Sequence, residues 1–156
     1  MDADRGQDGA SAVEFALVLP VLALLLFGII QFGLVFLQTQ GLEGAAREGG
    51  RVASVGADVT AISSAVRRAL SGLEGTLMLT IDRLDSTGVT TSTISTTVQT
   101  DGTPSSNAAD IVCNAATVNA LDIELVLEDM EVVIPLWGVS QFDYSANTRF
   151  RCESVG

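Results

Sequence analysis

An uncharged apolar run near the N-terminus is the feature that most limits how this chain can fold. Phe15–Leu37 holds 23 residues without a charged side chain. At the rise of an α-helix this run is about 34 Å long, and the hydrocarbon core of a bilayer is about 30 Å thick. The run therefore predicts a helix that crosses a membrane, and we take residues 10–37 as the complete membrane segment.

Glu14 lies directly before this run, inside an otherwise apolar stretch. A carboxylate in such surroundings costs free energy, by roughly 3 kcal/mol if it reaches the bilayer centre. An acidic residue at this place is therefore a candidate functional site, and its natural partner is a cation. The alternative is a plain anchor in which the Glu14 side chain extends to the lipid headgroups.

The segment before the run does not have the composition of a removable secretion signal. Such a signal has a cationic start, a shorter apolar core and a cleavage site made of small residues. Met1–Gly9 carries three aspartates and one arginine, and Gln38–Gln40 offers no such cleavage site. The run should therefore stay on the protein. Its orientation is open, because Arg5 precedes it while Arg47 and Arg51 follow it.

Two stretches of the chain resemble the signatures of one family. Gly9–Leu17 has the sequence GASAVEFAL, which is similar to the processing and assembly signature of type IV prepilins. Ala45–Gly49 has the sequence AAREG, which is similar to the end of the long helix in TadE-like proteins. These are minor pilins or pseudopilins of Tad (Flp) pilus systems. The resemblance is dense over Gly9–Val52 and weaker beyond, where Pro135 and the terminal Arg-Cys-Glu of residues 151–153 agree with the family.

The resemblance implies a proteolytic step. A membrane aspartic peptidase, the prepilin peptidase, would cut after Gly9 on the cytoplasmic side. Residues 1–9 would be the leader, Ala10 the new N-terminus and Glu14 the fifth residue of the mature chain. The same pattern assigns Phe15 and Pro20, with Glu14, to the assembly segment.

Physical chemistry gives a reason for this signature. Cleavage creates a positive α-amino group on Ala10, at the start of an apolar helix. When such helices bundle without water, the amine of one subunit and the Glu14 carboxylate of another form a charge-assisted contact that also sets their axial offset. Removing one partner leaves the other buried and unpaired.

The resemblance also implies partners, a location and a role. The partners would be the prepilin peptidase, other pilin and minor pilin subunits, the pilus assembly platform and the lipid membrane. The protein would be a single-pass membrane protein with its head outside the cytoplasm, or part of an extracellular pilus that acts in adhesion or surface attachment. Two alternatives stay open: a membrane-anchored extracytoplasmic binding module, and a pseudopilin of a secretion system.

The first helix is expected to continue beyond the membrane over residues 38–56. Pro20 removes one backbone hydrogen bond and predicts a bend near residues 16–20. Beyond the membrane, small residues recur at four-residue spacing: Gly41, Ala45, Gly49 and Ala53. Such a stripe lets another backbone approach closely, and either the chain's own head or another subunit fits it.

Residues 57–156 predict a small α+β head. Gly56 should end the first helix, and Asp58 should cap a second helix with an apolar stripe. This stripe comprises Ile62, Val66, Ala69, Leu70 and Leu73. Strand patterns cover Thr76–Leu84, Val89–Gln99, Asp122–Ile134 and Gln141–Cys152, with a turn at residues 85–88. Helices followed by locally connected strands predict an antiparallel sheet packed on the long helix, as in the pilin plan.

Cys113 and Cys152 are the two cysteines of the chain. If they pair, they close a loop of about 40 residues and stabilise the head by roughly 4 kcal/mol in the chain-entropy account. A disulfide would place the head outside the cytoplasm. The alternative is two unrelated buried thiols.

The residue inventory argues against an enzyme. The chain has no histidine and no lysine, which removes imidazole metal sites, histidine-assisted nucleophiles and Schiff-base lysines. A formal net charge of −11 repels nucleic acid. We therefore expect no catalysis, no cofactor, no metal and no nucleic-acid partner.

Two groups of carboxylates carry the oxygen ligands that calcium prefers. They are Asp122, Glu124, Glu128, Asp129 and Glu131, and Asp101 with Asp110. Neither group has the glycine-punctuated spacing of a loop that wraps the ion. The solvent side of a strand explains the first group better than a calcium site does.

Overall fold

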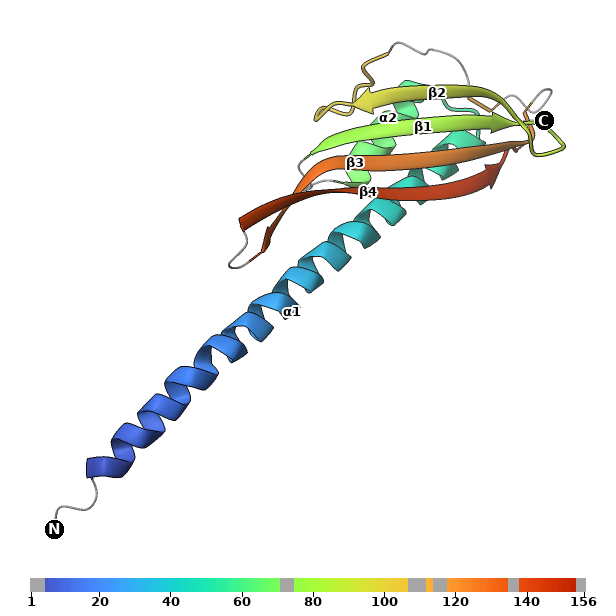
Figure 1. Ribbon diagram of the computed structural model, residues 1–156. Coiled ribbons are helices and arrows are strands. Elements are labelled where there is room, and N and C mark those ends of the chain that lie inside the picture. The colour runs from blue at the N-terminus through green and yellow to red at the C-terminus, as the bar shows by residue number, and fades with distance from the viewer. Residues whose placement is uncertain (1–4, 71–74, 107–111, 114–117, 135–137, 154–156) are drawn as a thin grey trace.

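The computed structural model describes residues 5–70, 75–106, 112–113, 118–134 and 138–153. Within these residues it has two helices, α1 (Arg5–Ser54) and α2 (Val59–Ala69). Its strands are β1 (Thr76–Leu84), β2 (Thr90–Val98), β3 (Ala120–Ile134) and β4 (Gly138–Arg151). Figure 1 shows α1 as a long spine whose C-terminal part carries α2 and the sheet. The expected α+β, pilin-like architecture is confirmed.

Helix α1 is one continuous element of 50 residues that contains Pro20. Figure 1 shows no sharp bend along it, so the expected bend is not seen, since hydrogen bonds on both sides of the missing one hold the helix together. The helix ends where predicted, because Gly56 has a positive φ of 85° and its N–H bonds to the Ala53 carbonyl at 3.1 Å.

Helix α2 begins as the sequence predicts. The Asp58 carboxylate accepts a hydrogen bond from the Ala61 N–H at 2.8 Å and so caps the helix. Ile62 and Val66 face the core and are fully buried. Ala69 is exposed and does not belong to the buried stripe, because α2 ends at this residue. Leu73, the last member of the expected stripe, lies outside the described residues.

The sheet is antiparallel, with strand order β2-β1-β3-β4. Its register sets buried aliphatic residues of β1 directly opposite those of β3, as Leu77 with Leu127, Leu79 with Leu125, and Ile81 with Ile123. Side chains alternate between the two faces of a strand, so these residues form one apolar face. The helices cover this face, and the opposite face carries threonine, serine and acidic side chains.

The small residues of α1 pack against the head of the same chain. Ala45 and Ala53 are completely buried. A Cβ atom added to Gly49 would lie 2.6 Å from a methyl group of Val66 in α2, and one added to Gly50 would lie 1.9 Å from the Phe150 ring in β4. Of the two explanations for the small-residue stripe, packing on the chain's own head therefore holds for this part of α1.

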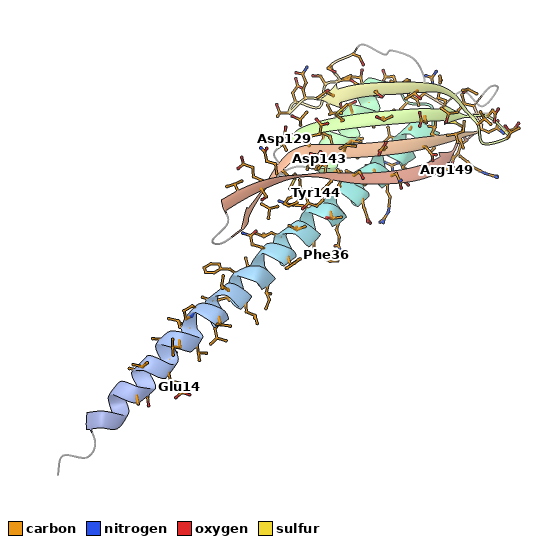
Figure 2. The ribbon with its side chains drawn as sticks, in the orientation of Figure 1. Glu14, Phe36, Asp129, Asp143, Tyr144 and Arg149 are labelled. Atoms are coloured by element: carbon orange, nitrogen blue, oxygen red, sulfur yellow. A yellow bond between two sulfur atoms is a disulfide. The ribbon has the colours of Figure 1, made fainter. Side chains whose placement is uncertain are left out.

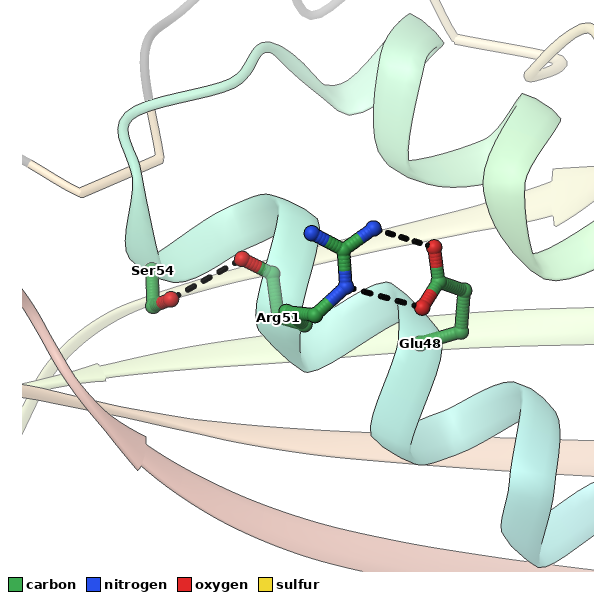
Figure 3. A network of polar contacts seen from close by, with 3 residues as sticks. All are labelled: Glu48, Arg51 and Ser54. Atoms are coloured by element: carbon green, nitrogen blue, oxygen red, sulfur yellow. Dashed lines mark hydrogen bonds and ion pairs between the residues drawn. The ribbon is translucent and has the colours of Figure 1, made fainter.

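The opposite side of α1 faces water and carries two ion pairs. An Arg47 Nη atom lies 3.1 Å from Glu43, one helical turn away. Arg51 makes two hydrogen bonds to Glu48, at 2.9 and 2.6 Å, and the Ser54 hydroxyl donates to the Arg51 carbonyl at 2.9 Å (Figure 3). Ion pairs this exposed contribute only tenths of a kcal/mol to stability, so they mainly mark the solvent-exposed face of the helix.

Strands β3 and β4 continue beyond the rest of the sheet. Pairing of β1 with β3 ends at Thr76 and Glu128, whereas β3 and β4 stay paired as far as Ile134 and Gly138. A register shift at residues 127–130 separates the two parts, and Asp129 there has a positive φ of 59°. We call residues 130–134 and 138–142 the arm.

Cys113 and Cys152 form a disulfide, with Cα atoms 5.6 Å apart. It joins the connection between β2 and β3 to the end of β4. Backbone bonds hold both ends nearby: the Val112 N–H donates to Ala57 at 3.3 Å, and the Glu153 N–H donates to Ser54 at 3.1 Å. Of the two alternatives for the cysteines, the paired one is therefore observed.

Gly50→Ala should destabilise the head, because the added methyl group meets the Phe150 ring. Overpacking costs about 1–3 kcal/mol and outweighs the gain of up to about 1 kcal/mol in helix propensity. Chemical unfolding of the full chain in detergent measures the change. Gly44→Ala is the matched control, since nothing lies within 4 Å of its added Cβ. Equal stabilities of the two variants would contradict the close packing.

Replacing both cysteines by serine should lower the free energy of unfolding by about 4 kcal/mol, because the closed loop spans 39 positions. The measurement is the denaturant midpoint of the oxidised protein against that of the double variant. Reductant should lower the wild-type midpoint to the same value and leave the variant unchanged. A wild-type midpoint that does not respond to reductant would contradict this role.

Candidate assembly site

All residues expected to act in processing and assembly lie on the N-terminal part of α1, far from the head. Gly9, Ala10, Glu14, Phe15 and Pro20 are all exposed. Figure 2 shows Glu14 on the side of the spine, with no other element beside it. Among the residues that the structure describes, none donates a hydrogen bond to Glu14 or forms an ion pair with it.

The surface that surrounds Glu14 is apolar and uncovered. Phe15 is 62% exposed, Leu17 73% and Phe32 79%. Exposed large apolar side chains continue along α1 as far as Leu37. This helix is long and apolar enough to cross a membrane, and the described part of the chain contains one such helix. Lipid or other helices must cover a band of this kind, because the head leaves it bare.

Helix geometry places the expected charge pair on one face of α1. Residues four apart lie on the same side of a helix, about 6 Å apart along its axis, so Ala10 and Glu14 are neighbours. In the uncut chain the residue at position 10 carries an amide and no charge. Cleavage would therefore convert a site with one anion into a site with an anion and a cation one turn apart.

Gly9 lies inside α1, since the helix begins at Arg5 and not at residue 10. A protease binds its substrate in an extended form, so the first turns must unwind before a cut at Gly9. Glycine in a helix interior is about 1 kcal/mol less favourable than alanine, which lowers the cost of unwinding here. A Cβ at Gly9 would meet nothing within 4 Å, so packing gives no reason for a glycine at this position.

Several charged groups on the head already have a partner. Arg149 donates from Nε to the Asp122 carboxylate at 2.7 Å, and this bond lowers the pKa of Asp122. Asp101 accepts from the N–H and the hydroxyl of Thr103, at 2.8 and 2.6 Å, and these bonds hold its pKa below the ordinary value. These carboxylates therefore serve a strand pair and a turn.

The described residues contain no group of three or more histidine, cysteine or acidic side chains arranged to hold a metal ion. Asp110, which belongs to the second carboxylate group considered for calcium, lies outside them. A groove where α1 meets β4 is lined by Glu43, Arg47 and residues 145–148. Its two charged side chains already pair with each other, and its other side chains are small and neutral.

The sequence patterns do not single out three residues that the structure makes prominent. Gly50 and Phe150 form the tight contact between α1 and β4, and the adjacent glycines at 49 and 50 are the only sequence signal of it. Val139 is 57% exposed on the arm. The sequence feature that points to Val139 is an uncharged stretch, residues 132–142, which is longer than a short hairpin requires.

Residues 9–51 match the family model of TadE-like proteins. The matched segment lies entirely within α1 and contains Gly9, Glu14 and the AAREG stretch. It ends where the packing of α1 on the head is tightest. No curated protein and no solved structure matches the chain.

Asp85→Asn should make the stability of the head less sensitive to acid. The Asp85 carboxylate accepts from Thr87, through N–H and hydroxyl, and from the Val89 N–H, and these bonds lower its pKa. A lowered folded-state pKa stabilises the fold above the unfolded value of about 3.9, and this contribution is lost as the pH falls through the folded value.

Denaturant midpoints measured between pH 7 and pH 2 check this expectation. The Asp85→Asn variant should lose less stability over the acid range than the wild type loses. Glu124→Gln is the control, since Glu124 is exposed and makes no hydrogen bond to a described residue. Identical acid profiles for the wild type and Asp85→Asn would show that the turn does not depend on this charge.

Proposed function

Because its first helix matches the TadE-like family model over residues 9–51, we propose that this protein is pilus-associated, as a minor pilin or pseudopilin of a Tad-type pilus. One observation carries the proposal: α1 presents an uncovered apolar surface on which Glu14 has no partner among the described residues. A single-pass anchor explains the apolar surface alone. Assembly between copies of such helices explains the apolar surface and the carboxylate together.

The first step of the proposed mechanism is hydrolysis of the peptide bond between Gly9 and Ala10. Water adds across this bond, so Gly9 gains a carboxylate and Ala10 gains an amine, which is protonated at neutral pH. The prepilin peptidase supplies the catalytic groups. The chain supplies a glycine near the start of α1, where the helix unwinds at low cost.

The second step is the meeting of α1 helices from different subunits. Their apolar surfaces would leave lipid and pack on one another, and the bare glycines at 28 and 33 permit close approach, since a Cβ there would meet nothing within 4 Å. The Glu14 carboxylate would then pair with the α-amine of another subunit. This pairing penalises wrong offsets, because a shifted helix loses the contact between the charges of different subunits.

In this proposal the protein acts by assembly and not by catalysis. The head would remain outside the cytoplasm and be carried on the surface of the filament or initiation complex. Its outer face of hydroxyl and carboxylate side chains is suited to water. Adhesion or surface attachment would be a property of the assembled pilus.

Intact mass spectrometry of the protein from membranes or sheared filaments tests the processing step. Loss of residues 1–9 and of two hydrogens, for the leader and the disulfide, is the expected result. Mature material that retains Met1–Gly9 would overturn the proposal. Normal pilus assembly with that uncut chain would favour the permanently anchored binding module.

Glu14→Ala should block incorporation into filaments while membrane insertion and head folding persist. Breaking a buried ion pair costs about 3 kcal/mol, roughly a hundredfold in the association constant. Immunoblots of sheared filaments and membrane fractions measure both effects. Glu43→Ala is the matched control, because Glu43 lies on the same helix outside the apolar run. Wild-type amounts of the Glu14→Ala protein in filaments would contradict the proposed role.

A further inference from the structure

The arm of β3 and β4 differs from the sheet that it extends. Along the sheet, the face that points away from the helices is polar, as at Thr80, Glu124 and Asn147. Beyond the bulge, residues 132–142 include no charged residue. Val139 is 57% exposed and Phe142 is 47% exposed. Past the Glu131–Gln141 pair, the two strands therefore carry no charged residue, and Val139 is an exposed apolar side chain there.

The arm points back along α1 toward the membrane segment. Figure 1 shows β3 and β4 extending from the head toward the N-terminal half of the spine. Measured along the direction of α1 in Figure 2, the described end of the arm reaches about as far as Phe36. Phe36 is 64% exposed and stands one residue before the end of the uncharged run of α1. The arm thus ends at the height where α1 would leave the bilayer.

The acidic groups of β3 and β4 all lie on the head side of the last three residue pairs of the arm. The Asp143 carboxylate accepts from the Asp129 N–H at 3.2 Å and so closes the bulge. Glu131 pairs across the strands with Gln141, at the base of the uncharged stretch. Carboxylates avoid the hydrocarbon region and are repelled by lipid phosphates, so this row of acids marks the natural limit of contact with lipid.

We propose that the arm is a second membrane contact, inserted into the lipid headgroup region of the outer leaflet beside α1. We take lipid to be the molecule that contacts the arm, because the uncharged part of the arm starts on the membrane side of the acidic residues and ends level with the last turn of the membrane helix. The inference needs α1 as an anchor and does not need processing or filament assembly. Held at two places, the head would keep one orientation on the membrane.

Spin labelling of the full chain in liposomes tests the contact. Val139→Cys is labelled with a nitroxide under conditions that keep the Cys113–Cys152 disulfide intact. Val89→Cys is the matched control, because Val89 is 61% exposed and lies in the β1–β2 connection, at the other end of the sheet. Leu26→Cys, in the middle of the uncharged run, reports insertion of α1.

The readout is the collision rate of each label with oxygen, which concentrates in lipid, and with a water-soluble nickel chelate. We expect the ratio of oxygen to nickel collisions to be several-fold higher at position 139 than at position 89, and highest at position 26. Equal ratios at positions 139 and 89, with a high ratio at position 26, would overturn the arm contact and leave the anchor intact.

Two other results are also decisive. A label at position 139 that is shielded from both reagents would mean that protein covers the arm, and would overturn the lipid contact. A label at position 26 that is open to nickel would overturn the anchor and the arm contact together. The disulfide and the unfolding midpoint of each labelled variant confirm that the head has folded.

Discussion

The close approach of α1 to its own head is the contact on which the rest of the structure depends. Ala45 and Ala53 are buried with no side chain beyond a methyl group, and Gly49 and Gly50 leave room for Val66 and Phe150. Since the spine lies so close, one helix can be a membrane segment at one end and part of a hydrophobic core at the other. The TadE-like match ends at residue 51, in this contact, so the matched segment covers both uses of the helix.

The paired carboxylates of the molecule and Glu14 lie in different surroundings. Glu43, Glu48 and Asp122 each have an arginine within reach, in water, and these pairs contribute little free energy. Glu14 stands in the only strongly apolar part of the spine and has no partner among the described residues. A carboxylate that water and an arginine easily satisfy at the C-terminal end of α1 or on the head is costly in the apolar segment, and this contrast in surroundings is the reason for the role proposed for Glu14.

Much of the fold follows from local sequence patterns. The cap at Asp58, the stop at Gly56 and the strand Thr76–Leu84 are predicted correctly, because each depends on neighbouring residues. The stripe of small residues on α1 is also visible in the sequence. The surface that packs on it is not, because a four-residue spacing fits the chain's own head and another subunit equally well. The Gly50–Phe150 contact joins residues 100 positions apart. Likewise, the arm exists because β3 and β4 extend beyond the end of β1, and no local sequence pattern predicts this difference in length.

The bond between the Glu153 N–H and the Ser54 carbonyl places the end of the last strand against the last turn of α1. A tensile load along the spine would therefore not peel the head away from one end. It would act in shear on several turns of packed helix at once, with the C-terminal segment bonded to the end of α1 farthest from the load. Such a contact would suit the proposed subunit, whose helix would be held by neighbouring helices while its head stays in water.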